Sequence, residues 1–260
     1  ALFTVQRPCS TLGENIMSLV SNLFLLFVAA SVLVYYIVPH RFQWIVLLAF
    51  SYIYYIAGGP RYVIFILFST VVTWLTALFI EKTEEKWNHK GARRLLILGL
   101  LLNFGMLGIV KYTNFAVENL NALFHMNLRE MKLLLPLGIS FYTFQTMSYT
   151  IDVYRGEVAA QKNILTFATY VTLFPQLIAG PIVQYKTVEK ELMHRKVTLE
   201  DFSEGAFRFS VGLAKKVLLA NQIGSLWNSI SQLNHMSVAT AWLGAIAFSF
   251  QIYFDFSGYS

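Results

Sequence analysis

The feature that most constrains this chain is a series of long apolar runs that contain no Asp, Glu, Lys or Arg. Each run is near or above the roughly 20 residues with which a helix spans the hydrocarbon of a bilayer. The chain as a whole is 56% hydrophobic and only 13% charged. We therefore expect an all-α, polytopic integral membrane protein with about six to eight transmembrane or re-entrant helices. The runs are Asn15–His40, Phe42–Pro60, Tyr62–Ile80, Leu133–Ile151, Asn163–Tyr185 and Val217–Phe254.

The charged residues lie mainly in the connections between these runs. The formal net charge is +6, but the basic residues are not interleaved with base-stacking aromatics, so we expect no nucleic-acid partner. Lys and Arg in short loops favour the cytoplasmic side of a membrane, and the lipid bilayer is the first partner that this pattern predicts. Because Cys9 is the single cysteine, we expect no internal disulfide and no metal cluster.

The first 16 residues differ from the rest of the chain. Ala1 to Ile16 are polar and match neither a secretory signal peptide nor an amphipathic targeting helix. Met17 is the natural candidate for a first residue. We therefore expect residues 1–16 to be a non-native or disordered leader, which N-terminal sequencing of the native protein would test.

The distribution of basic residues predicts an orientation. Five Lys and Arg residues fall between Glu81 and Arg94, so this loop is expected to be cytoplasmic. Counting from it places the turn at Arg41 inside and the turn at Arg61 outside. A further span, Leu95–Val110, should then lead outward to a loop at Lys111–Lys132. The three spans that precede the cytoplasmic loop are expected over residues 18–38, 42–57 and 62–80.

The run from Asn163 to Tyr185 is expected to be re-entrant. A full crossing would place the most basic connection, Lys186–Lys216, on the outer side. Pro175 and the Gly180-Pro181 pair interrupt the helix, and broken backbone at membrane depth is tolerated only when it is buried in protein or lines a cavity. We therefore expect Phe174–Val183 to face an internal chamber.

The final apolar run, Val217–Phe254, is too long for one crossing. Its first half carries several Asn, Gln and Ser residues. We expect a short interfacial helix followed by a span over about Val238–Phe254.

Four residues are candidates for the lining of that chamber. Gln145 lies in an apolar span with several hydroxyl residues, and Asp152 follows at the end of that span. Pro181 marks the broken segment. Asp255 ends the last apolar run, and a carboxylate at the bilayer centre costs roughly 2.5 to 3.5 kcal/mol on insertion scales. The alternative roles for these residues are interhelical hydrogen bonding, a proline kink and helix capping.

No catalytic residue is evident in the sequence. Acylation of a hydroxyl needs a general base, and imidazole has a suitable pKa near neutrality. All five histidines fall in turns, charged loops or polar connections, and neither a nucleophile elbow, a Walker loop nor a zinc-binding spacing is present. The histidines are His40, His89, His125, His194 and His235.

Six short motifs in a fixed order closely resemble the membrane-bound O-acyltransferase family, in particular its alginate O-acetyltransferase membrane-subunit type. The resemblance runs from about Met17 to Ser260, and the order of the motifs makes it specific although each is weak alone. The motifs are Lys111–Phe115 (KYTNF), Pro136–Gln145 (PLGISFYTFQ), Ile151–Gly156 (IDVYRG), Phe174–Ile182 (FPQLIAGPI), Gly212–Val217 (GLAKKV) and Tyr253–Tyr259 (YFDFSGY).

The resemblance implies an enzyme of the bacterial inner membrane that transfers an acyl group, commonly acetyl, to a hydroxyl of an exported or cell-surface polysaccharide such as alginate. The donor would be a cytoplasmic thioester, acetyl-CoA or an acyl carrier, and no bound cofactor is expected. Polysaccharide-modifying proteins on the outer side would be its partners. The hallmark histidine of the family follows the Tyr253–Tyr259 motif by some tens of residues. We therefore expect residues 17–260 to be an incomplete transmembrane domain that lacks its C-terminal spans and is inactive alone.

Two other functions would use similar features. A transporter or channel-like protein would exploit the broken helix and polar lining, but should also show intramembrane charge pairs or an internal repeat. A non-catalytic scaffold would present the basic surface of Lys186–Lys216 to an acidic carrier protein or to lipid.

Overall fold

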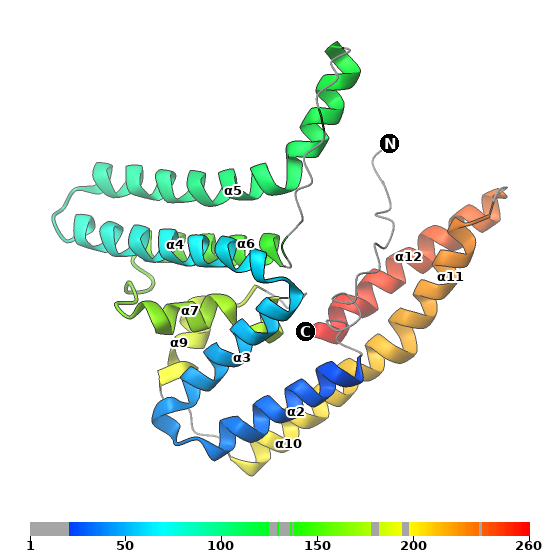
Figure 1. The fold of residues 1–260 in the computed structure, drawn as a ribbon, viewed down its shortest axis with the longest axis horizontal. Coiled ribbons are helices and arrows are strands. Elements are labelled where there is room, and N and C mark those ends of the chain that lie inside the picture. Colours follow the sequence, from blue (N-terminus) through cyan, green and yellow to red (C-terminus); the bar gives the residue numbers. More distant parts are fainter. Residues whose placement is uncertain are drawn as a thin grey trace. The chain divides into compact units, whose positions relative to one another are not determined.

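A computed structural model of the chain describes residues 21–124, 129, 136, 138–177, 182–193, 198–233 and 236–260. Every regular element within these ranges is helical, which confirms the predicted all-α class (Figure 1). The chain divides into two compact units, the first containing α2 to α9 and the second containing α10 to α12. The expected leader, residues 1–16, lies outside the described residues.

The first unit begins with three helices that agree with the predicted spans to within a few residues. Pro39 separates the first two, and the Gly59-Pro60 pair separates the second from the third, as turn residues should. The elements of the unit are α2 (Asn22–Ile37), η1 (His40–Phe42), α3 (Gln43–Gly58), η2 (Pro60–Tyr62), α4 (Val63–Glu84), α5 (His89–Phe124), α6 (Ile139–Tyr154), α7 (Ile164–Thr172), α8 (Phe174–Leu177) and α9 (Tyr185–Met193).

Two segments of the described chain are long and apolar enough to cross a membrane, and both belong to this unit. They are Pro60–Glu84, with a mean hydropathy of 2.4, and His89–Phe124, with a mean hydropathy of 1.9; Asn22–Ile37 is a shorter apolar helix. Large apolar side chains on these helices, such as Ile64 and Leu101, are exposed. A continuous apolar surface of this kind is suited to contact with lipid.

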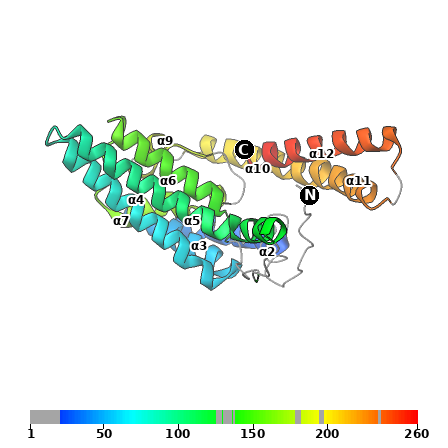
Figure 2. The ribbon, with the colours of Figure 1, turned by 90° about the horizontal axis from the view of Figure 1, so that it is seen from above.

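Helix α5 is longer than the sequence predicted. A loop was expected from Lys111 onward, but the helix continues through Phe124, and its later part bends away from the first part (Figures 1 and 2). No residue from 111 to 124 is buried. The prediction was wrong because polar residues mark where a chain leaves lipid, whereas a helix ends only where residues such as proline oppose it.

Helix α6 forms the centre of the first unit. Ten of its 16 residues are buried, because α4, α5 and α7 all pack against it; α4, α5 and α6 lie side by side in both views (Figure 2). Large fully buried side chains from these helices fill the core. They include Ile66, Ile80, Ile139, Tyr142, Tyr149, Phe167 and Tyr170.

The predicted interruption of the apolar run Asn163–Tyr185 is confirmed. Helix α7 ends at Thr172, and after the extended residue Leu173 the short helix α8 begins at Phe174. The backbone N–H of Phe174 donates to the hydroxyl of Ser51 on α3 at 3.2 Å. The rings of Phe27 and Tyr54 lie 5.4 and 5.9 Å from that of Phe174. Phe174 is therefore buried and its backbone N–H is satisfied, whereas the neighbouring Pro175 is exposed.

The second unit is a helical hairpin, in which α12 packs along α11 and along the π-helical turn η3 (Figure 1). A helix was expected over Val238–Phe254, and α12 covers these residues; it is not one of the two described segments that are apolar enough to cross a membrane. The expectation of a short interfacial helix before α12 is wrong. Residues 199–231 form one uninterrupted helix, and this stretch contains no proline. The elements are α10 (Leu199–Ala214), η3 (Lys215–Ala220), α11 (Asn221–Ser231) and α12 (Val238–Tyr259).

Candidate functional site

Gln145 holds both sides of the broken helix. Its side chain is 4% exposed in the middle of α6. The amide Nε2 donates to the backbone carbonyl of Tyr170 at 3.0 Å and to Oε1 of Gln176 at 3.2 Å. Tyr170 lies in α7 and Gln176 in α8, and the Tyr170 hydroxyl in turn donates to the carbonyl of Val183 at 2.9 Å. Gln145 therefore fixes the geometry of the Pro175 segment from the helix that faces it.

Asp152 lies two helical turns beyond Gln145, on the same face of α6. It is 8% exposed, and no side-chain hydrogen bond or ion pair reaches its carboxylate from the residues that the structure describes. Arg155, Glu157 and Lys186 are its charged neighbours. The structure thus brings two of the four predicted residues to one face of a buried helix.

A second polar cluster, which the sequence analysis missed, joins α4, α5 and α6. The Asn103 side chain accepts a hydrogen bond from Ser69 at 2.6 Å and donates to the Thr73 hydroxyl at 3.2 Å. The Ser69 hydroxyl also lies 3.5 Å from that of Thr146. All four side chains are buried. Two features of the sequence could have revealed this cluster. Asn103 lies within an uncharged run, and Ser69 and Thr73 lie four residues apart on one helix face.

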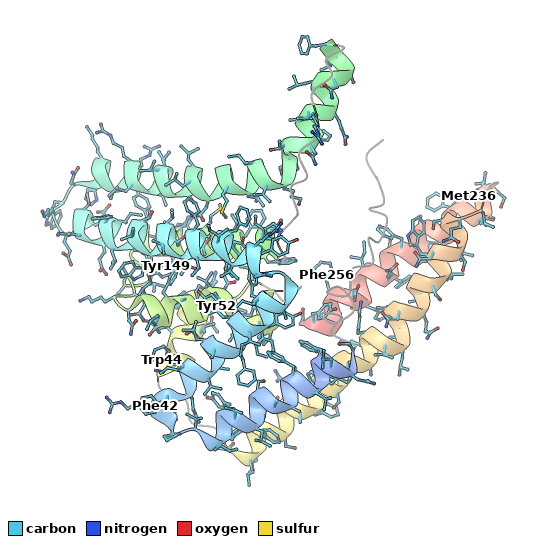
Figure 3. The ribbon with its side chains drawn as sticks, in the orientation of Figure 1. Phe42, Trp44, Tyr52, Tyr149, Met236 and Phe256 are labelled. Atoms are coloured by element: carbon cyan, nitrogen blue, oxygen red, sulfur yellow. The ribbon has the colours of Figure 1, made fainter. Side chains whose placement is uncertain are left out.

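Gln161 organises the connection between α6 and α7. Its carbonyl accepts from the indole N–H of Trp74 at 2.8 Å, and its backbone N–H donates to the hydroxyl of Tyr149 at 2.8 Å. Its side chain donates to the hydroxyl of Tyr185 at 2.8 Å. Tyr149, labelled in Figure 3, is fully buried. One loop residue thereby ties together α4, α6 and α9.

Asp255 forms an ion pair with Lys216 inside the second unit. The side chains of Asp255 and Lys216 are 29% and 21% exposed. The adjacent Lys215 donates from Nζ to the hydroxyl of Ser257 at 2.9 Å. The sequence singled out Asp255 but not Lys216, because a separation of 39 residues hides the contact.

Glycine on both helices allows this arrangement. A Cβ on Gly212 of α10 would lie 2.4 Å from the carbonyl oxygen of Gly258 on α12, and a Cβ on Gly258 would lie 3.0 Å from the Gly212 carbonyl oxygen. In η3 the N–H of Asn221 bonds to the carbonyl of Lys216, five residues earlier. Such π-helical turns are rare and occur frequently at functional sites. The close approach and the π turn together bring both lysines onto α12.

The remaining candidates are Pro181 and the five histidines. Pro181 lies outside the described residues, as do His125, His194 and His235. His40 and His89 are exposed at the ends of turns, and His89 lies 2.5 Å from the carboxylate of Glu84. Among the described residues, no group of three His, Cys, Asp or Glu is placed to hold a metal ion.

Comparison with known proteins gives several curated relatives, although no family model and no solved structure matches. The probable alginate O-acetylase AlgI of Pseudomonas aeruginosa is 39% identical over 245 residues, which are 92% of this chain and 47% of that protein. The peptidoglycan O-acetyltransferase of Helicobacter pylori is 32% identical over 244 residues, 83% of this chain and 45% of that protein. The teichoic acid D-alanyltransferase of Lacticaseibacillus rhamnosus is 26% identical over 199 residues, 71% of this chain and 45% of that protein.

The named activities of the relatives, and the length of chain over which they match, agree with what the motifs predicted. All three names describe the transfer of an acyl group. The chain spans about half the length of these curated relatives. It is therefore a relative of the alginate O-acetylases along 92% of its length, as the order of its motifs predicted.

Proposed function

We propose that the protein is a membrane O-acyltransferase that moves an acetyl group to a hydroxyl of an exported or cell-surface polysaccharide, with alginate as the first candidate acceptor. One observation carries the proposal. Five proteins named probable alginate O-acetylase are 36 to 40% identical to this chain, each over 92% of its length. Relatives named for peptidoglycan and teichoic acid act, by their names, on other polymers of the cell envelope.

The proposed reaction needs a thioester as co-substrate, acetyl-CoA or an acetylated carrier. The acceptor hydroxyl oxygen attacks the thioester carbonyl carbon, the carbon–sulfur bond breaks, and the thiol leaves. The hydroxyl proton passes to a base and from it to the departing sulfur. A positioned base typically contributes 10²- to 10⁴-fold to such a step. We propose that this base is the hallmark histidine that the family resemblance implies.

Contacts among the described residues support this proposal, because they hold together the helices that would surround the proposed chamber. Gln145 fixes α7 and α8 against α6 through two hydrogen bonds. Asp152 adds a carboxylate on the same face, and Pro181 belongs to the segment that these helices lead into. We propose that these residues and Asp255 lie near a tunnel from which water is excluded, because excluding water limits hydrolysis of the thioester.

We further propose a multi-pass arrangement in the bacterial inner membrane, with about six to eight transmembrane or re-entrant helices in this part of the protein. The exposed apolar surfaces of α2, α4 and α5 support contact with lipid. The thioester donor would arrive from the cytoplasm, and polysaccharide-modifying proteins would act on the outer side.

Complementation tests the proposed function. The gene, extended to the full length of its relatives, is expressed in an alginate-producing strain that lacks its own alginate O-acetylase, and ester-linked acetyl is measured on the secreted alginate by NMR. We expect acetyl esters to return, and an empty vector to give none. Stable protein in the membrane without acetyl esters on alginate would exclude alginate as the acceptor, and peptidoglycan from a matching deletion strain would be measured next.

A further inference from the structure

The π turn η3 carries two adjacent cations, whereas the part of α12 that faces it carries one carboxylate. Lys216 pairs with Asp255. Lys215 donates to the neutral hydroxyl of Ser257, and no carboxylate of the described chain lies within ion-pair distance of Lys215. The crossing of α10 and α12 therefore keeps one uncompensated positive charge.

The surroundings of this charge are unlike those of an ordinary surface lysine. Residues 209–214 and 217–254 contain no Asp, Glu, Lys or Arg, and Lys215 itself is partly buried. Arg208, two turns earlier on the same helix, has a side chain that is 77% exposed and pairs with Glu204 in the ordinary way of a solvated surface. Lys215 therefore lies in less polar and less exposed surroundings than Arg208.

The contact geometry leaves hydrogen-bond donors available. An ammonium has three N–H donors, and the structure gives Lys215 Nζ one hydrogen-bond partner. The Ser257 hydroxyl accepts from Lys215 and retains its own O–H for donation. Because Gly212 and Gly258 set the spacing of the two helices, the ammonium and the hydroxyl form a fixed pair of donors. Such a pair is complementary to an oxyanion.

We propose that Lys215 and Ser257 bind an oxyanion of a substrate, while Asp255 neutralises Lys216 and fixes the crossing. This inference rests on the proposed function, which supplies two sources of the same chemistry. The thioester donor carries phosphate groups, and an acceptor built from uronic acids carries carboxylates. In either case the site binds substrate, and the reacting carbonyl and hydroxyl lie elsewhere on the same molecules.

Steady-state kinetics of the full-length protein in lipid nanodiscs test the proposal. Lys215→Gln is expected to raise the KM for one substrate roughly ten- to a hundredfold, which is the scale of a lost hydrogen bond to a charged group. Lys215→Arg should restore most of the affinity, and Arg208→Gln, the matched control on the same helix, should leave both KM values unchanged. Ser257→Ala is a second test, and it is expected to raise the KM for the same substrate several-fold.

Two substrate analogues identify the source of the oxyanion. Acetyl-pantetheine is a thioester without phosphate, and carboxyl-reduced alginate is an acceptor without carboxylate. If the site binds the donor, the defect of Lys215→Gln disappears with acetyl-pantetheine; if it binds the acceptor, the defect disappears with carboxyl-reduced alginate. Direct binding of acetyl-CoA and of alginate oligomers to the nanodisc protein should weaken in the same pattern.

The failures can be told apart. Wild-type protein that binds neither substrate and transfers no acetyl group would overturn the proposed function. Wild-type protein that transfers acetyl normally, with unchanged KM values and binding in both Lys215→Gln and Ser257→Ala, would overturn the oxyanion site alone.

Discussion

Several buried polar side chains in the first unit are paired across helices. Lipid offers no hydrogen-bond partners, so polar groups on apolar helices must be satisfied within the protein. Asn103 is 2% exposed and bonds to Ser69 on α4, to Thr73 on α4 and to the carbonyl of Gly99 at 3.1 Å. This single side chain therefore joins α5 to α4.

Asn103→Ala is expected to destabilise the protein by roughly 1 to 2 kcal/mol, because the buried hydroxyls of Ser69 and Thr73 lose their partner. The check is thermal unfolding of the detergent-solubilised protein. Asn119→Ala is the matched control, since Asn119 lies on the exposed part of α5 and its side chain bonds, among the described residues, to the carbonyl of Phe115 in its own helix. Equal melting temperatures for the two variants would contradict the assigned role of Asn103.

The start of α10 carries a pH-sensitive cap. The Thr198 hydroxyl accepts from the N–H of Asp201, and the Asp201 carboxylate accepts from the N–H of Thr198 at 2.9 Å. The Thr198 hydroxyl also donates to the Asp201 carboxylate at 2.7 Å, and this hydrogen bond, followed by the one from the Thr198 N–H, lowers the pKa of Asp201 below the ordinary value. A lowered folded-state pKa contributes stability at pH values above the unfolded pKa of about 4, and this contribution is lost as the pH falls through the folded pKa.

We therefore expect the first turn of α10 to fray as the pH falls below about 4. Hydrogen exchange of the backbone amides of Asp201 and Phe202, which bond to the hydroxyl and the carbonyl of Thr198, measures the effect after correction for the intrinsic pH dependence. Asp201→Asn should show the faster exchange already at neutral pH and should lose the pH dependence. Identical exchange in both proteins at neutral pH would mean that the carboxylate does not stabilise the turn.

Chemically distinctive residues could be found from the sequence, but their partners could not. Gln145, Asp152 and Asp255 stand out because polar groups are rare in apolar runs, and the structure buries the first two. From the sequence, Lys216 belongs to a basic connection. Only the fold shows that it lies beside Asp255. A contact across 39 residues depends on how helices cross, which residue type alone does not reveal.

At the scale of elements, the sequence predicted best where residues that stop helices coincide with the edges of apolar runs. Helices α2 and α3 and the start of α4 follow this rule. Where a run ended only in polar residues, as at Lys111, the helix continued. The same reason explains the uninterrupted helix over residues 199–231, in which Lys215 and Lys216 mark a π turn and not a break.

The crossing of α10 and α12 depends on small residues at the point of contact. We expect Gly212→Ala to destabilise the second unit by about 1 to 3 kcal/mol, because the new methyl group would overlap the Gly258 carbonyl and force the helices apart. Gly205→Ala on the same helix meets no atom within 4 Å and should stabilise by about 0.5 to 1 kcal/mol through helix propensity. Thermal unfolding of both variants checks the opposite signs, and a stabilising Gly212→Ala would contradict the close contact.

The break between α7 and α8 depends on one hydroxyl. Ser51→Ala removes the partner of the Phe174 N–H and should cost about 1 to 3 kcal/mol, the price of an unsatisfied buried donor. Ser31→Ala is the control, because the Ser31 hydroxyl is also buried but bonds only to the carbonyl of Val28 in its own helix. Faster hydrogen exchange at Phe174 in Ser51→Ala alone would confirm the assignment, and unchanged exchange would contradict it.

For the whole molecule, the number of helices that cross the bilayer follows from which loops lie on which side. The sequence places the connection between α4 and α5 in the cytoplasm, because five Lys and Arg residues flank it. It places the turn between α3 and α4 outside. Both predictions can be tested on single exposed residues, Trp87 in the first connection and Arg61 in the second.

We expect opposite labelling of Arg61→Cys and Trp87→Cys, each in a Cys9→Ser background that removes the one cysteine of this sequence. In spheroplasts, a membrane-impermeant maleimide should label Arg61→Cys alone, and in inside-out vesicles it should label Trp87→Cys alone. Both should react fully after detergent is added, since Trp87 is 86% exposed and Arg61 is exposed. The reverse pattern would invert the orientation, whereas labelling of both sites from one side would show that α4 does not cross the bilayer.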